Sequence, residues 1–254
     1  MTGVLAEAPV HEPSELLVRL RAVTPPPAVL DRRREEQLTD RQREILDQLV
    51  DMFAEGFADL TMAEIAARAN CSLRTLYGLA PSRDELVLAV VDRNLWIIGR
   101  SAIEAIGTDM EPIEALAAYL TAANAAVEGM TEAFARDLAA VPAAQRLADF
   151  HAGYLVAVAR CLLDLAVERG DIPDVDTAAV AHVLASVARM LSLPEVMPSL
   201  RTTPHQAADE VVEIVLRGLG GDTGRSAHPD DAPNPNPNPT PTPTPTRPRP
   251  RRRP

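Results

Sequence analysis

The stretch TMAEIAARANCSLRTLYGLAPSRDEL, residues 61–86, decides the fold of this chain. It reads as two short helices, 61–69 and 72–79, joined by a sharp turn. Ala66 is small where the two helices must cross closely. Asn70 stands at the turn, where we expect a positive φ, a conformation that Asn tolerates better than most residues. The spacing predicts a helix-turn-helix.

The second of these helices divides its residues between two faces. Apolar contacts across the first helix are expected from Ile65, Leu73, Leu76 and Leu79. The side chains left to point outwards are polar or basic: Ser72, Arg74, Thr75 and Tyr77. Such a face is typical of a recognition helix, which lies in the major groove of DNA. An ordinary helical hairpin has the same pattern, but a capped long helix and a large apolar helical body follow here, and this context favours DNA binding.

The composition indicates an all-α protein. The 254 residues are 46% hydrophobic but only 3% aromatic, and Ala, Leu and Val dominate, a mixture that favours packed helices over sheets. No apolar stretch approaches the roughly 20 residues of a membrane span, so we expect a cytoplasmic protein with no membrane partner. Cys71 and Cys161 have no neighbours at metal-ligand spacing, so we expect small buried hydrophobes and no metal site.

The net charge of −11 opposes nucleic-acid binding at first sight, because Lys and Arg dominate the affinity for phosphates. The chain has no Lys, and all 25 of its cationic side chains are Arg. Residues 31–87 hold eight Arg against twelve acidic residues, a net charge of −4. DNA binding by this segment therefore depends on a few placed Arg. The run Arg32-Arg33-Arg34 approaches the DNA backbone or minor groove in one interpretation and is merely solvated in the other.

Several helix starts carry their own capping residues, which bind the free N–H groups of a first turn. Four pairs fit a capping box: Thr39 with Gln42, Thr61 with Glu64, Ser82 with Glu85, and Thr203 with Gln206. Three further helices start at Pro112, at Pro142 and, after a capping Asp176, at Thr177. The predicted helices cover 39–55, 61–69, 72–79, 83–107, 112–128, 131–140, 142–169, 177–192 and 204–219.

These signals divide the chain into four segments. They are a flexible N-terminal arm (1–38), a helix-turn-helix DNA-binding domain (39–82), a helical effector-binding and dimerisation domain (83–220) and a disordered tail (221–254). Pro25-Pro26-Pro27 cannot continue a helix, so the arm has at most a helical turn around Leu16 to Leu20. The tail, rich in Pro and ending in Arg, is either a DNA tether or a partner-binding strand.

The string from Thr61 to Leu86 resembles the DNA-binding signature of TetR/AcrR-family transcriptional regulators. The matching residues are Thr61, Ile65-Ala66, Ser72, Thr75-Leu76-Tyr77 and Ser82-Arg83 through Leu86. Residues 166–191 also resemble that family's turn into its dimerisation helices. The resemblance implies a TetR-like, all-α fold, with an N-terminal three-helix DNA-binding domain and a C-terminal helical domain for ligand binding and dimerisation. The chain departs from the family at Asn70, where Gly is usual, and at Leu79-Ala80, where an aromatic pair is common.

The chemistry of the side chains assigns roles at the DNA. Arg74 is the candidate for a base-edge contact, because a guanidinium binds O6 and N7 of guanine together; the alternative is a solvated helix charge. Ser72, Thr75 and Tyr77 are candidates for phosphate contacts, which set register and carry little sequence information. Arg83, at the capped start of the fourth helix, is a candidate for a further phosphate. Thr61 and Leu73 complete the predicted DNA-binding set.

The helical body is expected to dimerise and to bind an effector. The dimerisation stripes lie on helices 177–192 and 204–219: Val180, Val183, Leu184, Val187, Val211, Val212, Val215 and Leu216. A dimer would place two recognition helices about 34–36 Å apart, although a simple intrachain core also explains the stripes. The candidate ligand-pocket residues are Trp96, Tyr119, Phe134, Phe150, His151 and Tyr154, although a place in the simple core is the favoured explanation of each.

The sequence therefore predicts a transcriptional regulator that binds double-stranded operator DNA as a homodimeric repressor. An unknown small molecule, apolar or amphipathic, is expected to release it. No Gly-rich phosphate loop, paired-carboxylate site or nucleophile with a local base stands out, so no catalytic residue, cofactor or enzymatic activity is expected. The alternative is a TetR-like fold that acts as a protein-interaction module with little or no DNA binding.

Overall fold

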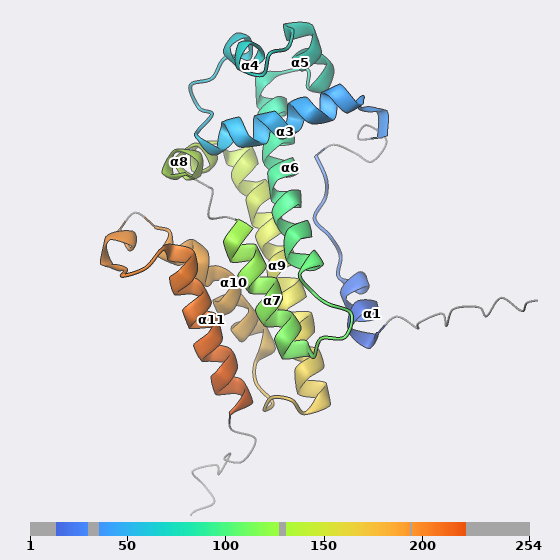
Figure 1. Ribbon diagram of the computed structural model, residues 1–254, viewed down its shortest axis with the longest axis vertical. Helices are drawn as coiled ribbons and strands as arrows, with labels where there is room; N and C mark the ends of the chain where they lie inside the picture. Colours follow the sequence, from blue (N-terminus) through green and yellow to red (C-terminus); the bar gives the residue numbers. More distant parts are fainter. Residues whose placement is uncertain (1–13, 30–35, 127–130, 194, 222–254) are drawn as a thin grey trace, which may run out of the picture. The chain divides into compact units, whose positions relative to one another are not determined.

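The computed structural model describes residues 14–29, 36–126, 131–193 and 195–221, and it confirms the all-α prediction over these residues (Figure 1). The predicted run Arg32-Arg33-Arg34 and the tail lie outside the described residues. The helices are α1 (Glu15–Ala22), α3 (Asp40–Ala54), α4 (Met62–Arg68), α5 (Leu73–Leu79), α6 (Arg83–Glu104), α7 (Pro112–Ala126), α8 (Glu132–Ala140), α9 (Pro142–Arg169), α10 (Thr177–Leu191) and α11 (Pro204–Gly220). A short 3₁₀ turn, Met197–Ser199, precedes α11.

The capping residues read from the sequence begin the helices as predicted. Both bonds of a capping box form at Thr39, Thr61 and Thr203. At Ser82 the structure has the first of the two bonds, in which the hydroxyl accepts from the Glu85 N–H at 3.2 Å. Asp176 caps α10 through the N–H of Ala179 at 3.1 Å. Local hydrogen-bonding chemistry therefore accounts for most helix starts.

Two clusters of buried apolar side chains organise these helices. The first, which we call the head core, joins α3, α4 and α5 to the start of α6, and it includes Ile45, Ile65 and Leu76. It also takes Phe134 from α8 and Leu147 from α9, so it extends beyond the boundary at 82–83 that the sequence predicts. The second, the body core, joins α1, the end of α6, α7, α9, α10 and α11.

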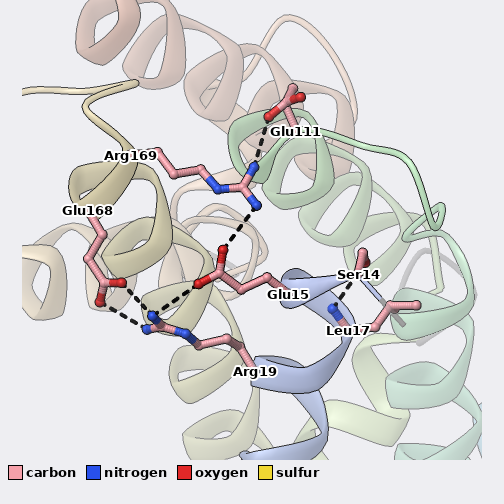
Figure 2. A network of polar contacts seen from close by, with 7 residues as sticks. All are labelled: Ser14, Glu15, Leu17, Arg19, Glu111, Glu168 and Arg169. Carbon is pink, nitrogen blue, oxygen red and sulfur yellow. Dashed lines mark hydrogen bonds and ion pairs between the residues drawn. The ribbon is translucent and has the colours of Figure 1, made fainter. Parts of the chain in front are cut away.

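The segment read from sequence as an arm with one helical turn contains α1, a docked helix. Ser14 caps it, and Leu16 and Leu20 are buried in the body core. Figure 2 shows the polar contacts that surround this packing. Arg19 binds Glu168 of α9 at 2.5 and 2.9 Å, and Arg169 bridges Glu15 and Glu111 at 3.5 and 3.1 Å. The sequence did not predict a docked helix here because partners of α1 such as Glu168 lie about 150 residues away, where a local pattern does not reveal them.

Residues 23–29 follow α1 and are joined to the middle of the helical body. The N–H of Val29 donates to Oδ2 of Asp92 on α6 at 2.8 Å. The other oxygen of Asp92 lies 3.2 Å from Nε2 of His151 on α9, and both of these side chains are more than nine-tenths buried. The chain is therefore fixed to α6 and α9 shortly before it enters the head.

One helix, α9, is long and apolar enough to cross a membrane by length and composition, which the sequence analysis did not anticipate. In the structure it packs against α6, α7, α8, α10 and α1, and its buried residues include Val158, Leu162 and Leu165. Such a helix is hydrophobic because several neighbours cover it. Its composition is explained by its place in the body core.

The two cysteines differ from the prediction of full burial. Cys71, in the turn before α5, and Cys161, on α9, are both half-buried free thiols. Burial raises the pKa of each thiol, and the charges of Arg41 and Arg19 respectively oppose that rise. Both side chains lie at the edge of a core, and neither is paired in a disulfide.

Candidate nucleic-acid interface

The turn between α4 and α5 has the geometry that the sequence predicts. Asn70 has a φ of 47°, in the left-handed region. The N–H of Cys71 donates to the carbonyl of Ala66 at 3.0 Å, and the N–H of Asn70 donates to Ala67 at 3.3 Å. These two bonds close the end of α4 in the arrangement that normally uses Gly at the left-handed position. Asn70 therefore takes the place of the usual Gly without changing the turn.

The recognition helix, α5, presents one face to the core and the other to solvent. Leu76 and Leu79 are buried, as predicted, whereas Leu73 is 44% exposed. The prediction that Leu73 packs across α4 is wrong, because its position in the first turn of a seven-residue helix points it away from the core. Arg74 and Tyr77 are also exposed. The outer face of α5 thus combines an apolar, a cationic and a phenolic side chain.

The hydroxyl groups of the predicted set begin the two helices. Thr61 caps α4, and its N–H and hydroxyl bind the carboxylate of Glu64 at 2.8 and 2.7 Å. These two hydrogen bonds hold the pKa of Glu64 below its ordinary value. Ser72 caps α5 through the N–H of Thr75 at 3.1 Å, and the two hydroxyls lie 2.9 Å apart. Ser72 and Thr75 are therefore neighbours at the start of the recognition helix.

Arg83, which the sequence predicts to contact a phosphate, binds backbone carbonyls in the structure. Its guanidinium donates to three backbone carbonyls in the segment between α3 and α4, those of Phe57, Ala58 and Leu60, at 2.6–2.7 Å. The side chain is 30% exposed. Because the planar guanidinium is occupied by these carbonyls, Arg83 joins the start of α6 to this segment.

Asp137 of α8 holds the opposite side of the same segment, and sequence reasoning missed it. Its Oδ2 accepts from the N–H groups of Phe57 and Ala58 at 2.6 and 2.8 Å. Burial raises the pKa of Asp137, but these hydrogen bonds and Arg136 lower it more, so the carboxyl titrates below its ordinary range. Only the fold brings Asp137 to a segment about 80 residues earlier, so no local sequence signal marks it.

The start of α3 also lies beside the recognition helix, a feature absent from the sequence prediction. Thr39, Arg41 and Gln42 share a hollow of about 340 Å³ with Ser72, Arg74, Thr75 and Gly78. Arg41 also donates to the carbonyl of Asn70 at 3.4 Å. Three predicted DNA-binding residues are therefore brought together with three residues from outside the helix-turn-helix.

The predicted ligand-pocket residues separate into different environments. Phe134 is buried in the head core, with its ring edge-on to Phe57 at 5.8 Å between centroids, so it does not line a pocket in the body. Phe150 is 56% exposed on α9, which also excludes it from an interior pocket. The structure thus gives these two residues no place in the interior of the body, because residue type alone does not reveal which face of a helix is covered.

The remaining four pocket candidates lie in the body. Trp96 stands edge-on to the ring of His151, with centroids 5.4 Å apart. Burial raises the pKa of Tyr119 and of Tyr154, and Tyr154 raises that of Tyr119 further, so both phenols remain neutral. Within the described residues, the hydroxyl of Tyr119 and Nε1 of Trp96 are buried without a hydrogen-bond partner. Unsatisfied buried donors are rare in proteins.

Side chains that could bind a metal ion do not cluster in the described ranges. No group of three or more His, Cys, Asp or Glu side chains suited to holding a metal ion occurs there.

The comparisons with known proteins agree with this geometry. Residues 45–90 match the model of bacterial regulatory proteins of the tetR family. A TetR transcription regulator from Haloarcula marismortui is 20% identical, with a TM-score of 0.60 over 72% of this chain and 99% of that chain. A tetR-family regulatory protein from Rhodococcus RHA1 is 20% identical, with a TM-score of 0.52 over 72% and 98%. A TetR-family regulator from Thermus thermophilus is also 20% identical, with a TM-score of 0.51 over 69% and 98%. No curated protein matches the chain.

A helix-turn-helix head joined to an all-helical body defines a class of DNA-binding transcriptional regulators, and the described residues have that architecture. Within this class, residues 45–90 match the tetR-family model, and the described chain has the fold of TetR-family regulators. At identities of about 20% the likeness to solved structures concerns the fold alone.

Proposed function

We propose that this protein is a sequence-specific repressor that binds operator DNA as a homodimer and is released by a small-molecule effector. The observation that carries the proposal is the exposed face of α5, on which Arg74 and Tyr77 reach solvent while Leu76 and Leu79 anchor the helix. A recognition helix needs this division between a buried and a free face. As a regulator of this kind, the protein acts in the cytoplasm and catalyses no reaction.

The proposed contacts differ in what they read. Arg74 binds a guanine edge, and Leu73, exposed at the start of α5, contacts a thymine methyl group. Tyr77 and the hydroxyls of Ser72 and Thr75 contact phosphates, and Thr61 lies at the start of the neighbouring helix. Arg83 supports this surface through its carbonyl contacts and does not touch DNA in this proposal.

The proposal is tested by footprinting with the DNA upstream of the protein's own gene. Protection of one site at low salt is expected, and absence of protection would refute DNA binding. In mobility shifts, Arg74→Ala should relax preference at one base pair per half-site, at a cost of about 1–3 kcal/mol for the preferred base. Tyr77→Phe should weaken all sequences about equally, and the reverse pattern would overturn the assigned roles.

The proposed dimer rests on apolar side chains that the single chain leaves uncovered. Leu184, Val187, Val212 and Leu216 of the predicted stripes are buried within the chain. In contrast, the exposed fractions of Val183, Met190 and Ile214 are 58%, 53% and 67%. Such side chains on adjacent helices are suited to an interface between two copies. Sedimentation should report a dimer that Ile214→Arg converts to a monomer of unchanged helicity, and a wild-type monomer would contradict the proposal.

The proposed effector is an amphipathic molecule with a hydrogen-bond acceptor. Tyr119 and Trp96 offer buried donors without partners among the described residues, and Tyr154 and His151 lie beside them. A carbonyl or carboxylate group on an otherwise apolar molecule would satisfy such a donor. A panel of compounds of this class should contain one that raises the melting temperature and releases DNA. Tyr119→Phe should weaken that effect, and an equal effect in this variant would exclude Tyr119 from the site.

The second candidate is a protein-interaction module that keeps the fold without DNA binding. The observation that favours it is the charge of the DNA-binding segment, where residues 31–87 carry a net charge of −4. Footprinting separates the two functions, because a module of this kind leaves every DNA sequence unprotected at low salt, where electrostatic binding is strongest.

A further inference from the structure

The hollow between the start of α3 and the recognition helix is lined by polar and cationic side chains. Its lining comes from two segments about 30 residues apart: Thr39, Arg41, Gln42, Ser72, Arg74, Thr75 and Gly78. Neither Asp nor Glu is part of this lining. It borders the exposed face of α5, where the proposed function places DNA.

The capping box of α3 fixes the direction of the Gln42 side chain. Its Oε1 accepts from the N–H of Thr39 at 2.9 Å, so this end of the amide must be the oxygen. The other end, Nε2, faces α5, where a Cβ added to Gly78 would lie 3.6 Å from it. The described residues offer Nε2 no hydrogen-bond acceptor. Two N–H donors are thus held toward the hollow, and Gly78 leaves room in front of them.

Arg41 supplies positive charge at the rim of the same hollow. Its side chain is 50% exposed, and the guanidinium is held between Glu44, at 2.9 Å, and the carbonyl of Asn70, at 3.4 Å. Arg74 lines the hollow from the α5 side and is exposed. An anion between the two Arg would compete with Glu44 for Arg41. The hollow therefore suits a ligand that has only acceptor oxygens and a negative charge.

We propose that this hollow binds one phosphate of the DNA backbone and that Arg41 and Gln42 of α3 are DNA-contacting residues. The inference rests on the proposed function, because it requires α5 to lie on DNA. Phosphate oxygens accept hydrogen bonds and carry charge, which matches the amide and guanidinium donors of the hollow. The DNA-contacting surface then extends from the helix-turn-helix to α3, the helix that precedes it.

The test exploits the tolerance of a capping box for either Gln or Glu at its third helical position. Gln42→Glu keeps an oxygen for the Thr39 N–H but replaces the two amide donors with a charged acceptor. We expect DNA affinity to fall about tenfold or more for every sequence, because like charges then face each other. Gln206→Glu makes the same change in the capping box of α11 and is the matched control, with affinity expected to stay within about twofold of wild type.

Arg41→Ala provides a second variant that leaves the capping box intact. Removal of one phosphate contact should make the slope of log affinity against log salt shallower by about 0.9. The ratio of wild-type to variant affinity should then be about eightfold larger at 0.1 M salt than at 1 M salt. Glu44→Gln should strengthen binding, because it frees Arg41, and the gain should vanish when Arg41 is also Ala. A purely structural Arg41 would produce no change in the salt slope.

The outcomes separate the inference from the proposed function. Wild-type protein that protects no DNA refutes the proposed function and this inference with it. The inference alone is overturned if the wild-type protein binds DNA, Gln42→Glu and Gln206→Glu have equal DNA affinity, and Arg41→Ala leaves the salt slope unchanged. Melting curves of each variant identify a loss of fold, and if Gln42→Glu unfolds, the salt slope of Arg41→Ala decides the question.

Discussion

Replacement of Asp137 by Ala tests how α8 is joined to the head. The carboxylate is 5% exposed, and its Oδ2 accepts from Phe57 and Ala58 at 2.6 and 2.8 Å. Hydrogen bonds to charged groups contribute about 1.5–3 kcal/mol each. Ala58 is exposed, so its freed N–H binds water, whereas the N–H of Phe57 stays buried and unpaired. We therefore expect the free energy of unfolding to fall by about 3 kcal/mol.

Thermal unfolding followed by circular dichroism measures this loss. About 3 kcal/mol corresponds to a decrease of about 6–12 °C in melting temperature for a chain of this size. Asp137→Asn should lose less, because an amide oxygen still accepts both N–H groups without charge. Asp149→Ala, on an exposed position of α9, is the matched control and should change stability by less than about 0.5 kcal/mol. A melting temperature of Asp137→Ala within about 2 °C of wild type would refute the reasoning.

The same carboxylate predicts a pH dependence of stability. The pKa of Asp137 is lowered in the folded state, so its stabilisation is fully present above the pKa of an unfolded Asp, about 3.9. It is lost as the pH falls below that value and through the folded pKa. Wild-type protein should thus lose more stability than Asp137→Asn between pH 5 and the acid limit of the native state. Parallel curves for the two proteins would contradict this assignment.

Three further predictions concern the backbone, α1 and Arg83. Gly56→Ala should destabilise the protein by more than about 2 kcal/mol, because its φ is 108° and an added Cβ would lie 3.1–3.2 Å from Ala133 and Asp137. In the same melting experiment Gly170→Ala should cost only about 1 kcal/mol, because its φ is 77° but the space around it is open. Leu16→Ala should cost about 2–4 kcal/mol and Arg19→Ala much less, because buried packing outweighs exposed ion pairs. Hydrogen exchange in α1 measures both losses, and the reverse order would show that the ion pairs hold the helix. Arg83→Met should lower the melting temperature and leave the salt slope of DNA binding unchanged, whereas a slope shallower by about 0.9 would restore Arg83 as a phosphate contact.

Sequence reasoning predicted the helices well because their ends are local events. Thr39 and Thr203 begin capping boxes, and Asn70 stands at a turn. The interactions at these positions span only three to five residues, so a local pattern reveals them. Residues 45–90 also carry the family signature in one continuous stretch. The fold class and the helix-turn-helix were accessible for these reasons.

The parts that sequence reasoning missed depend on pairs of residues far apart in the chain. Asp137 and Phe57, Arg19 and Glu168, and Val29 and Asp92 each meet across more than 60 residues. Phe134 and Phe150 show the same limit, since one is buried in the head core and the other is exposed, although both are aromatic residues on helices. The hollow beside α5 was missed because only the fold brings Arg41 and Gln42 to the recognition helix, about 30 residues later in the chain.

The segment between α3 and α4 has a consequence for protein engineering. Connections between helices are usually the places that tolerate inserted tags, chain breaks at new termini and protease cleavage. This segment does not fit that rule, because the carbonyls of Phe57, Ala58 and Leu60 bind Arg83 and the N–H groups of Phe57 and Ala58 bind Asp137. A protease needs an extended backbone with free polar groups, and five backbone groups of this connection are already bound to Arg83 or Asp137. An insertion there should therefore disturb α6 and α8 together, and reporters are better placed elsewhere on the surface.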